Sequence, residues 1–217
     1  MKALITAGPT YEPIDPVRFI GNRSSGKMGI AIANEFAGRG YEVILVKGPT
    51  HLKSNHTGVT EIEVETAAQM YEQCAQYFPQ CDVIIFSAAV ADYTPKNPSP
   101  TKIKKAGNEM TVELVKTKDI AGELGKTKKP NQVVVGFALE TDNELHNAQQ
   151  KLYNKHLDFI ILNSVKDAGA AFQHDTNKVT ILDNSGKQVI FELKPKTEVA
   201  KDIANYVSVI LESKKAK

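Results

Sequence analysis

The sequence predicts an α/β protein built on a mostly parallel sheet with helices on both faces. Short apolar runs typical of buried strands recur along the chain, and amphipathic helical stripes separate them. Residues 82–86 form a continuous apolar run, as expected for a central parallel strand covered on both sides. This alternation indicates a doubly wound, Rossmann-like architecture, which binds ligands beyond the carboxyl ends of its strands.

The composition is that of an ordinary globular domain. The chain has 217 residues, 41% hydrophobic and 24% charged, which is enough for one full core. The formal net charge of +2 gives no overall attraction to nucleic acid or to a membrane surface. Cys74 and Cys81 have neither metal-ligand spacing nor a disulfide framework. With no signal-peptide pattern and no apolar run of membrane length, we expect a cytoplasmic protein.

The first half of the chain alternates strands and helices. Residues 3–6 read as a buried strand that Gly8-Pro9 ends, and residues 28–39 read as a helix with apolar positions four apart. Ser24 or Ser25 is the expected N-cap of that helix. The pattern continues with strands at 41–46, 60–64 and 82–86 and with a helix capped by Thr66 that carries Met70, Cys74 and Tyr77.

A glycine-rich stretch, residues 21–29, joins the first predicted strand to the first helix. Exposed N–H groups at a helix start beside glycines form a ready site for an anion. Gly21 to Lys27 fits the spacing G-x-x-x-x-G-K, but Met28 stands where a P-loop has its magnesium-binding Ser or Thr. A standard P-loop is therefore excluded. A phosphate site and a plain glycine-rich turn both remain open.

The middle of the chain, residues 92–109, is too long for an ordinary connection. It contains Pro95, Pro98 and Pro100, followed by the basic run Lys102-Ile103-Lys104-Lys105. A lysine-rich lid over a binding crevice and a solvated basic loop are both consistent with this composition. Residues 110–115 then resume as a strand.

The second half returns to the strand–helix pattern. Leu145, Ala148 and Leu152 should face inward from a helix over residues 142–155. Lys151 and Lys155 share one face near the end of that helix, where they either complement the helix dipole or clamp a polyphosphate. The remaining predicted elements are strands at 132–137 and 157–162, a hairpin around Asp183-Asn184-Ser185-Gly186, and a final helix with Val199, Ile203, Val207 and Ile210.

Small or polar residues follow three of the predicted strands and should converge on one crevice. These are Gly8-Pro9-Thr10, Ser87-Ala88-Ala89 and Gly136-Phe137-Ala138. A dinucleotide site is weakly supported, because G-x-G-x-x-G is absent and strand two ends in Val46-Lys47-Gly48 without a ribose-binding acid. A nicotinamide-dependent reductase and a non-catalytic nucleotide-binding module stay as alternatives.

Several motifs together resemble the phosphopantothenoylcysteine synthetase family, in order and through nearly the whole chain. They are Thr6-Ala7-Gly8-Pro9-Thr10, Asp15-Pro16-Val17-Arg18-Phe19-Ile20, Asn22 with Ser24-Ser25-Gly26-Lys27-Met28-Gly29, Ala88-Ala89-Val90-Ala91-Asp92-Tyr93, Lys102-Ile103-Lys104-Lys105, Gly136-Phe137-Ala138 with Glu140-Thr141, and Lys151 with Lys155. Two positions depart from the family: Arg23 stands where His is frequent, and Thr117-Lys118-Asp119 replaces a common Asn-Pro-Asp.

This resemblance implies a ligase of coenzyme A biosynthesis. Such enzymes join 4′-phosphopantothenate to L-cysteine, using Mg²⁺ and CTP in most bacterial members or ATP in others. The carboxylate becomes an acyl-nucleotide with release of pyrophosphate, and the cysteine amine then displaces the nucleoside monophosphate. The resemblance also implies one ligase domain over residues 1–217 with a flap at about 92–109, a homodimer, and a separate phosphopantothenoylcysteine decarboxylase as pathway partner.

The resemblance implies roles for individual residues as well. Asn22 would contact the reacting carbonyl of the acyl-nucleotide, and Lys102 would bear on the α-phosphate, so these two are the expected catalytic residues. Together with the glycine-rich stretch, the expected nucleotide-binding residues are Gly8, Ser24, Gly26, Ala88, Asp92, Asp119, Ile120, Phe137, Lys151 and Lys155.

Overall fold

The computed structural model describes residues 1–105, 107–164 and 174–215. Within these ranges the main sheet has eight strands in the order β13-β12-β10-β9-β6-β1-β4-β5. The six strands from β10 to β5 run parallel, and β12 and β13 complete one edge antiparallel. The strands are β1 (Lys2–Ala7), β4 (Glu42–Lys47), β5 (Val59–Glu63), β6 (Val83–Phe86), β9 (Val133–Glu140), β10 (Phe159–Ser164), β12 (Val179–Asp183) and β13 (Gln188–Ile190).

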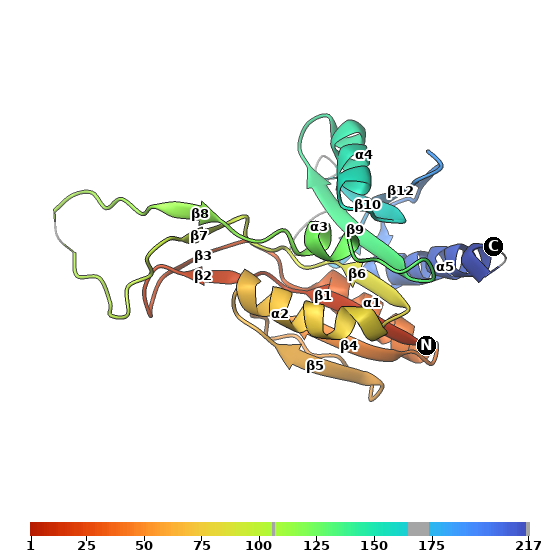
Figure 1. The fold of residues 1–217 in the computed structure, drawn as a ribbon, viewed down its shortest axis with the longest axis horizontal. Helices are drawn as coiled ribbons and strands as arrows, with labels where there is room; N and C mark the ends of the chain where they lie inside the picture. Colours follow the sequence, from red (N-terminus) through yellow and green to blue (C-terminus); the bar gives the residue numbers. More distant parts are fainter. Residues whose placement is uncertain (106, 165–173, 216–217) are drawn as a thin grey trace.

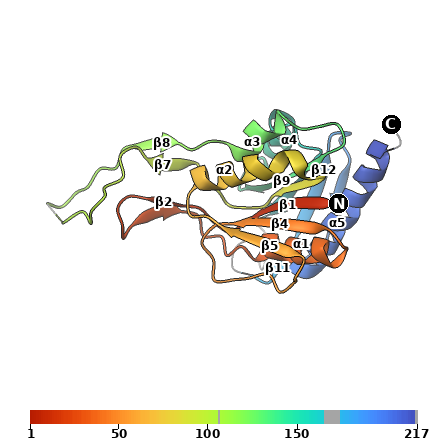
Figure 2. The ribbon, with the colours of Figure 1, turned by 60° about the horizontal axis from the view of Figure 1, so that its bottom comes forward.

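Helices cover both faces of this sheet (Figures 1 and 2). Ile32 and Phe36 of α1 and Val199 and Ile203 of α5 pack with one set of alternating strand side chains. The side chains on the opposite face pack with α2, α3 and α4. The helices are α1 (Lys27–Gly38), α2 (Ala67–Tyr77), α3 (Ile120–Gly125), α4 (Glu144–Asn154) and α5 (Lys196–Lys215), with a 3₁₀ turn η1 (Phe78–Gln80) after α2. The predicted doubly wound fold is confirmed.

The strand order places a topological switch point between β1 and β6. The chain leaves β1 toward β4 and β5, then returns to β6 on the other side of β1 and continues to β9 and β10. The ends of β1 and β6 stay joined, because the Ala89 N–H donates to the Gly8 carbonyl at 2.9 Å. A crevice outside the carboxyl ends of the strands at such a point is the usual ligand site of open α/β sheets.

The predictions from sequence are mostly confirmed at the level of elements. Thr66 caps α2 with a full capping box, and the hairpin around residues 183–186 pairs antiparallel. Two side-chain predictions are wrong. Gly26 at φ 79° is the N-cap of α1 instead of Ser24 or Ser25, because the chain enters this helix in the left-handed region that glycine tolerates. Leu145 is 47% exposed, because it lies on the outer face of α4.

The lysine-rich flap expected at about residues 92–109 is part of a longer arm that extends from one end of the body (Figure 1). It consists of residues 92–117, in which β7 (Tyr93–Pro95) pairs with β8 (Leu114–Lys116), and it lies beside the hairpin β2 (Tyr11–Pro13)–β3 (Phe19–Gly21). The strand predicted at 110–115 is thus confined to three residues of the arm. A further small ribbon pairs β11 (Thr176–Asn177) with β14 (Lys194–Pro195).

Asp15 of the hairpin holds the arm. Its carboxylate accepts the N–H of Ile103 at 3.1 Å, and Arg18 donates to the Ile103 carbonyl at 2.6 Å. Burial by itself would raise the pKa of Asp15, but the N–H groups of Val17, Ile103 and Arg18 and the Arg18 guanidinium outweigh it and lower the pKa. Over the part of the chain that the structure describes, no helix is both long and apolar enough to cross a membrane.

Candidate nucleotide-binding site

A cavity of about 710 Å³ opens at the carboxyl ends of the strands, at the switch point. Its walls come from the glycine-rich loop 22–29, the ends of β6, β9 and β10, the base of the arm, α3, and the last turn of α4. Its lining residues come from elements on both faces of the sheet. We call the part around Asp119, Lys151 and Lys155 the α4 side, and the part around Lys27, Met28, Asn163, Asn177 and Lys196 the α5 side.

Gly8, Gly26 and Gly48 let the glycine-rich loop pack closely against the ends of β1 and β4. Gly8 and Gly26 have φ of 80° and 79°, and a Cβ on Gly26 would lie 3.2 Å from the Gly8 nitrogen. A Cβ on Gly48, at the end of β4, would lie 1.6 Å from the Pro9 carbonyl oxygen. No real Cβ atom fits at 1.6 Å, and one at 3.2 Å would be tight in a left-handed backbone conformation that side chains rarely adopt. The ends of β1 and β4 and the start of α1 therefore meet closely because side chains are missing there. The loop is therefore held in place by backbone contacts.

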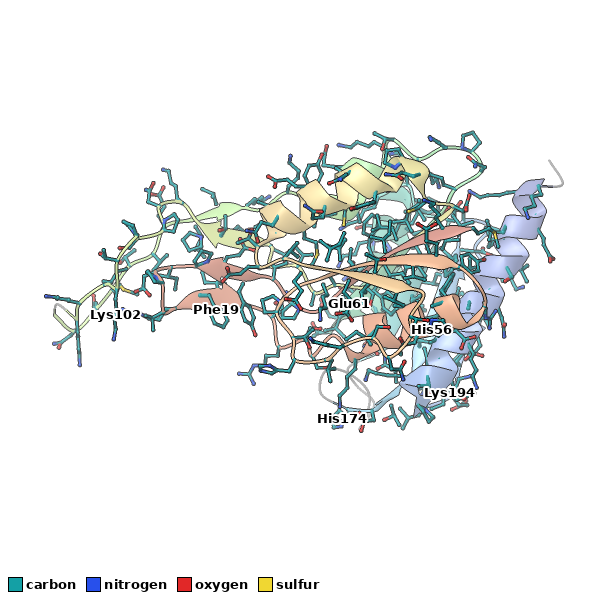
Figure 3. The ribbon with its side chains drawn as sticks, turned by 90° about the horizontal axis from the view of Figure 1, so that it is seen from below. Phe19, His56, Glu61, Lys102, His174 and Lys194 are labelled. Atoms are coloured by element: carbon teal, nitrogen blue, oxygen red, sulfur yellow. The ribbon has the colours of Figure 1, made fainter. Side chains whose placement is uncertain are left out.

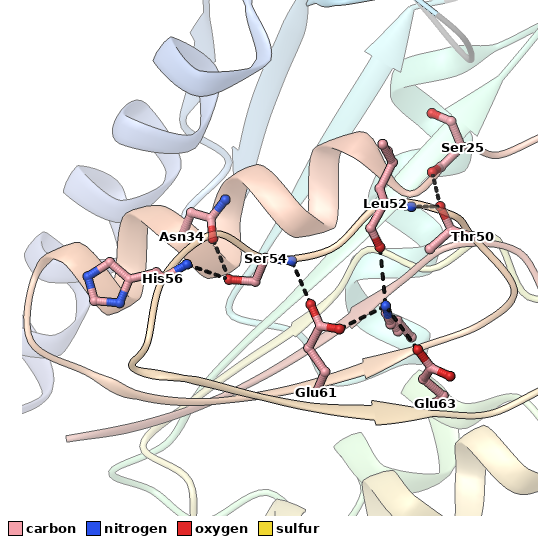
Figure 4. A network of polar contacts seen from close by, with 9 residues as sticks. Ser25, Asn34, Thr50, Leu52, Ser54, His56, Glu61 and Glu63 are labelled. Atoms are coloured by element: carbon pink, nitrogen blue, oxygen red, sulfur yellow. Dashed lines mark hydrogen bonds and ion pairs between the residues drawn. The ribbon is translucent and has the colours of Figure 1, made fainter.

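A polar network behind the loop fixes residues 48–56 (Figure 4). Lys47 is 1% exposed, and its ammonium lies 2.8 Å from Glu61 and 3.3 Å from Glu63 and donates to the Leu52 carbonyl at 3.1 Å. Burial lowers the pKa of Lys47, but its bonds with the two glutamates outweigh burial and raise the pKa. The segment so fixed carries Thr50, whose hydroxyl donates to the Ser25 carbonyl at 2.9 Å.

Asn22 connects the glycine-rich loop to the loop after β6. Its amide nitrogen donates to the carbonyls of Ala89 and Val90, each at 3.0 Å. In β1, next to β6, the Thr6 hydroxyl accepts the N–H groups of Ser87 and Ala88 at 3.1 and 3.0 Å. Asn22 thus holds the cavity wall in this structure, and its expected contact with a reacting carbonyl stays a prediction.

Lys151 and Lys155 both reach the cavity from the last turn of α4. Lys155 lies 2.9 Å from Asp119, and Lys151 lies 2.6 Å from Glu140. Asp119 also caps α3 by accepting the Gly122 N–H at 3.1 Å. Since both lysines line the same cavity as the glycine-rich loop, they can act on a ligand as well as on the helix dipole.

The structure brings together most of the residues that the sequence singled out. Among the described lining residues are Asn22, Ser24, Gly26, Ala88, Asp92, Asp119, Ile120, Phe137, Lys151 and Lys155. Gly8 lies behind the loop, under Gly26, and is not part of the described lining. Lys102 lies near the far end of the arm, away from the body (Figure 3), and the described lining does not include it either. Its expected action on a phosphate stays a prediction.

Sequence reasoning missed several lysines of the cavity. Lys116, Lys118 and Lys196 line it in addition to Lys27 of the glycine-rich stretch and the two lysines of α4, whereas the carboxylates in the described lining are Asp92 and Asp119. Burial and the neighbouring Lys27 lower the pKa of Lys196. Lys116 and Lys118 lie at the base of the arm and Lys196 lies at the start of α5, so only the fold reveals that they surround one space. Their excess over carboxylates favours a polyanionic ligand.

A magnesium ion would have to come largely with such a ligand. In the ranges that the structure describes, no three His, Cys, Asp or Glu side chains gather as a metal cluster. Mg²⁺ usually keeps several waters and binds through one or two carboxylates plus substrate phosphates. Asp92 and Asp119 in the cavity wall fit this mode, and they do not form an all-protein cage.

A family model, a solved structure and curated proteins are all similar to this chain over nearly its whole length. Residues 1–210 match the family described as DNA/pantothenate metabolism flavoprotein C-terminal domain. A solved structure of the C-terminal domain of coenzyme A biosynthesis bifunctional protein CoaBC is 40% identical, with a TM-score of 0.83 over 98% of this chain and 96% of that one.

Two curated relatives are longer proteins. The coenzyme A biosynthesis bifunctional protein CoaBC of Bacillus subtilis (strain 168) is 44% identical over 207 residues, which are 95% of this chain and 51% of the relative. A protein of an unknown prokaryotic organism, named cysteine/cysteine sulfinic acid decarboxylase, is 52% identical over 210 residues, or 97% of this chain and 58% of the relative. The chain thus spans little more than half of either.

Proposed function

Because this chain belongs to the family of the DNA/pantothenate metabolism flavoprotein C-terminal domain, we propose that it is a phosphopantothenate–cysteine ligase. It joins 4′-phosphopantothenate to L-cysteine in coenzyme A biosynthesis, at the expense of a nucleoside triphosphate. The observation that carries the proposal is the cavity at the switch point, where a glycine-rich helix start and an excess of lysines face one space. A product with a free cysteine carboxylate suits a phosphopantothenoylcysteine decarboxylase as the next enzyme of the pathway.

The proposed reaction has two steps. A carboxylate oxygen of phosphopantothenate attacks the α-phosphorus, and pyrophosphate leaves with the electron pair of the broken P–O bond. The cysteine amine then forms the C–N bond to the acyl carbon, and the nucleoside monophosphate leaves. Neither step needs a covalent bond to the protein, so the protein contributes positioning and stabilisation of negative charge.

The lining residues suit these tasks. The N–H groups at the start of α1, beside Gly26, and the ammonium groups of Lys151 and Lys155 would bind phosphate oxygens. The nucleoside would lie among the lining residues Ala88, Asp92, Asp119, Ile120 and Phe137. Mg²⁺ would neutralise phosphate charge during the transfer.

Lys102 requires a second proposal, because it lies on the arm and away from the cavity. We propose that the protein is a homodimer in which the arm, residues 92–117, contacts the partner copy. Exposed apolar side chains along the arm and its hairpin support this: Phe19, Tyr93 and Leu114 are 49%, 46% and 41% exposed. Such an arrangement could carry Lys102 to a neighbouring cavity, while a folding-back of the arm would bring it to its own.

One incubation tests the ligase. The protein is mixed with 4′-phosphopantothenate, L-cysteine and either CTP or ATP, and monophosphate and pyrophosphate are measured. We expect both products in equal amounts, with CTP preferred. Without cysteine, pyrophosphate should form only to the level of enzyme sites. An equal or higher kcat/KM with ATP would overturn the predicted preference for CTP but not the proposed ligase activity.

Further incubations, with L-cysteine alone, with the triphosphate alone and with a reduced nicotinamide, separate the alternatives. Carbon dioxide release from L-cysteine alone would favour the activity in the name of the 52%-identical relative. Nucleotide binding without any pyrophosphate would favour a non-catalytic module, and oxidation of a reduced nicotinamide would favour a reductase. A cytoplasmic location stays a prediction; the two buried, unpaired cysteines are consistent with it.

A further inference from the structure

Glu12 is a buried carboxylate in the hairpin β2–β3, whose other strand is largely accessible to solvent. It lies in the middle of β2 and is 3% exposed, whereas Phe19 and Gly21 of β3 are exposed. The described lining of the cavity does not include Glu12, and the proposed reaction gives it no role. A carboxylate is seldom buried so deeply unless it is paired or hydrogen-bonded, so its contacts indicate what it does.

The contacts of Glu12 join the hairpin to the first turn of α2, which lies beside it (Figure 1). The Glu12 Oε1 accepts the Ala67 N–H at 2.8 Å. Next to this bond, the Tyr11 N–H donates to the Glu65 carbonyl, also at 2.8 Å. The first N–H groups of a helix have no partner within the helix, and the helix dipole favours a negative charge there. Glu12 is therefore an acceptor that the hairpin supplies to α2.

The helix that receives this bond is fixed to the main sheet. Met70 and Cys74 of α2 are fully buried, and Phe78 directly after the helix is buried as well. They belong to the same packed cluster as side chains of β1, β4 and β6. Side chains packed in this way cannot shift without opening a cavity, so α2 keeps its place on the sheet. Glu12 thus bonds the hairpin to the rigid body of the protein.

The turn between β2 and β3 in turn holds the arm, residues 92–117. The Asp15 carboxylate accepts the Ile103 N–H at 3.1 Å, and Arg18 donates to the Ile103 carbonyl at 2.6 Å. Ile103 directly follows Lys102 in the sequence. The hairpin therefore sets the course of the arm near Lys102, and Glu12 sets the place of the hairpin on the body.

We propose that Glu12 is a positioning residue, which fixes the hairpin to α2 and thereby sets the position of Lys102. This inference rests on the proposed ligase and on the expected action of Lys102 on the α-phosphate. It holds for an arm that serves its own cavity and for one that serves a partner copy, because the hairpin directs the arm in both cases. Misplacing a reacting group by about 1 Å can cost on the order of a hundredfold in rate, so a loosened hairpin should slow the reaction.

The rate of pyrophosphate formation without cysteine tests this role. For Glu12→Ala, measured well below its melting temperature, we expect the rate to fall at least about tenfold. KM for the triphosphate should stay within about twofold, because Lys151, Lys155 and the start of α1 are held by other contacts. Glu12→Gln keeps an acceptor for the Ala67 N–H, so its rate should stay within about threefold of wild type. A Gln variant as slow as the Ala variant would overturn the positioning role.

Gln132→Ala is the matched control for lost stability. Gln132 is 1% exposed and donates to the carbonyls of Phe78 and Cys81, each at 2.8 Å, at the ends of the strands opposite the cavity. The substitution truncates a buried polar side chain of the same length as Glu12. The melting temperature should fall at least as far as in Glu12→Ala, with an unchanged rate of pyrophosphate formation. An equal loss of rate in the two variants would assign the effect to stability and overturn the inference.

A double-mutant cycle with Lys102→Gln shows whether Glu12 acts through the arm. If Glu12 positions Lys102, adding Glu12→Ala to Lys102→Gln should cost little further rate, because the charge to be positioned is already absent. A further loss of about tenfold in the double variant would overturn the inference. A normal rate in Lys102→Gln beside a slow Glu12→Ala would overturn it as well.

A distance measurement separates this inference from the ligase itself. Spin labels are attached at Gln76→Cys on α2 and at Lys104→Cys on the arm, where both side chains are exposed and the two native cysteines are buried. Dilution with unlabelled protein restricts the measured distances to one chain. We expect Glu12→Ala to shift or broaden the distance distribution and Gln132→Ala to leave it unchanged, even if no pyrophosphate is ever formed. Ligase activity together with the same distribution with and without Glu12→Ala would keep the ligase and reject the positioning role.

Discussion

The glycine-rich loop 21–29 and the arm 92–117 were both expected to act on phosphates, but the structure builds them in opposite ways. The loop is fixed from behind by three glycines, by Thr50 and by the buried Lys47 network. The arm has mostly exposed residues and is held to the body chiefly by its β2–β3 neighbour and by Asp15. Thus contacts within the chain hold the loop on several sides, whereas few such contacts hold the arm.

The largest expected effect is on folding and tests whether the loop is really held by backbone contacts. The Cβ of Gly48→Ala would lie 1.6 Å from the Pro9 carbonyl oxygen, so the strand ends must separate. We expect a loss of roughly 4 kcal/mol or more in the free energy of unfolding, measured by urea denaturation.

Gly107→Ala on the arm is the matched control for this substitution. Gly107 has φ 76°, and beyond its chain neighbours no described atom lies within 4 Å of the place that an alanine methyl would take. The cost should therefore be about 1 kcal/mol of local backbone strain. The urea midpoint of the body should hardly move. Equal midpoints for the Gly48 and Gly107 variants would remove the distinction between loop and arm.

Lys102→Gln gives the largest expected effect on activity. The substitution keeps length and polarity but removes the charge, and loss of one such electrostatic contact costs on the order of 10²–10³ in rate. We expect pyrophosphate formation to fall at least about a hundredfold, with an unchanged melting temperature because the side chain is exposed. Lys104→Gln, two residues away, should cost much less. Near wild-type formation of the acyl-nucleotide by Lys102→Gln would show that Lys102 does not act on the phosphate and that the arm is a solvated basic loop.

Mixing two inactive variants tests whether the arm acts on a partner. Lys102→Gln is combined with the cavity variant Lys155→Met under conditions that exchange subunits. If each arm serves the other copy, half of the dimers are mixed and each has one intact site, so about a quarter of wild-type activity should return. If each arm folds back on its own chain, no mixed site is complete and activity stays at the level of the separate variants.

Thr50→Val should have a smaller effect, on affinity. The hydroxyl of Thr50 holds the Ser25 carbonyl at 2.9 Å, and a typical hydrogen bond contributes about 1 kcal/mol. We expect KM for the triphosphate to rise about fivefold, which corresponds to that energy, with kcat little changed. Ser99→Ala removes a similar bond within the arm, from the Ser99 hydroxyl to the Thr101 carbonyl at 2.6 Å, and should leave this KM unchanged.

Asp15→Asn should have the smallest effect on stability. The pH dependence of its melting temperature tests whether the Asp15 carboxylate stabilises the fold. The folded-state pKa of Asp15 is lowered, so the carboxylate stabilises the fold above its unfolded pKa of about 3.9. That contribution disappears as pH falls through the folded-state value. Melting temperatures from pH 7 to pH 3 should therefore show a steeper acid loss for the wild type than for Asp15→Asn. Parallel curves would show that Asp15 does not couple to folding.

Local sequence determined the elements of the body. Apolar runs and helical stripes depend on neighbouring residues, so the strands of the parallel sheet, the Thr66 cap and the hairpin at residues 183–186 could be predicted from them. The resemblance to a known family named ten residues that the structure places in the cavity wall. The strand-end residues meet because parallel strands bring their carboxyl ends to one edge.

Tertiary structure alone decided what lies far apart in sequence and close in space. The N-cap Gly26 lies against Gly8, and Gly48 lies against the Pro9 carbonyl, where no side chain would fit. Lys27, Asn163 and Lys196 line the same cavity, although Asn163 lies 136 positions after Lys27 and Lys196 lies 33 positions after Asn163. The distance of Lys102 from the cavity follows from the course of the arm. No local pattern encodes such meetings, because they arise from the order and register in which the strands pair.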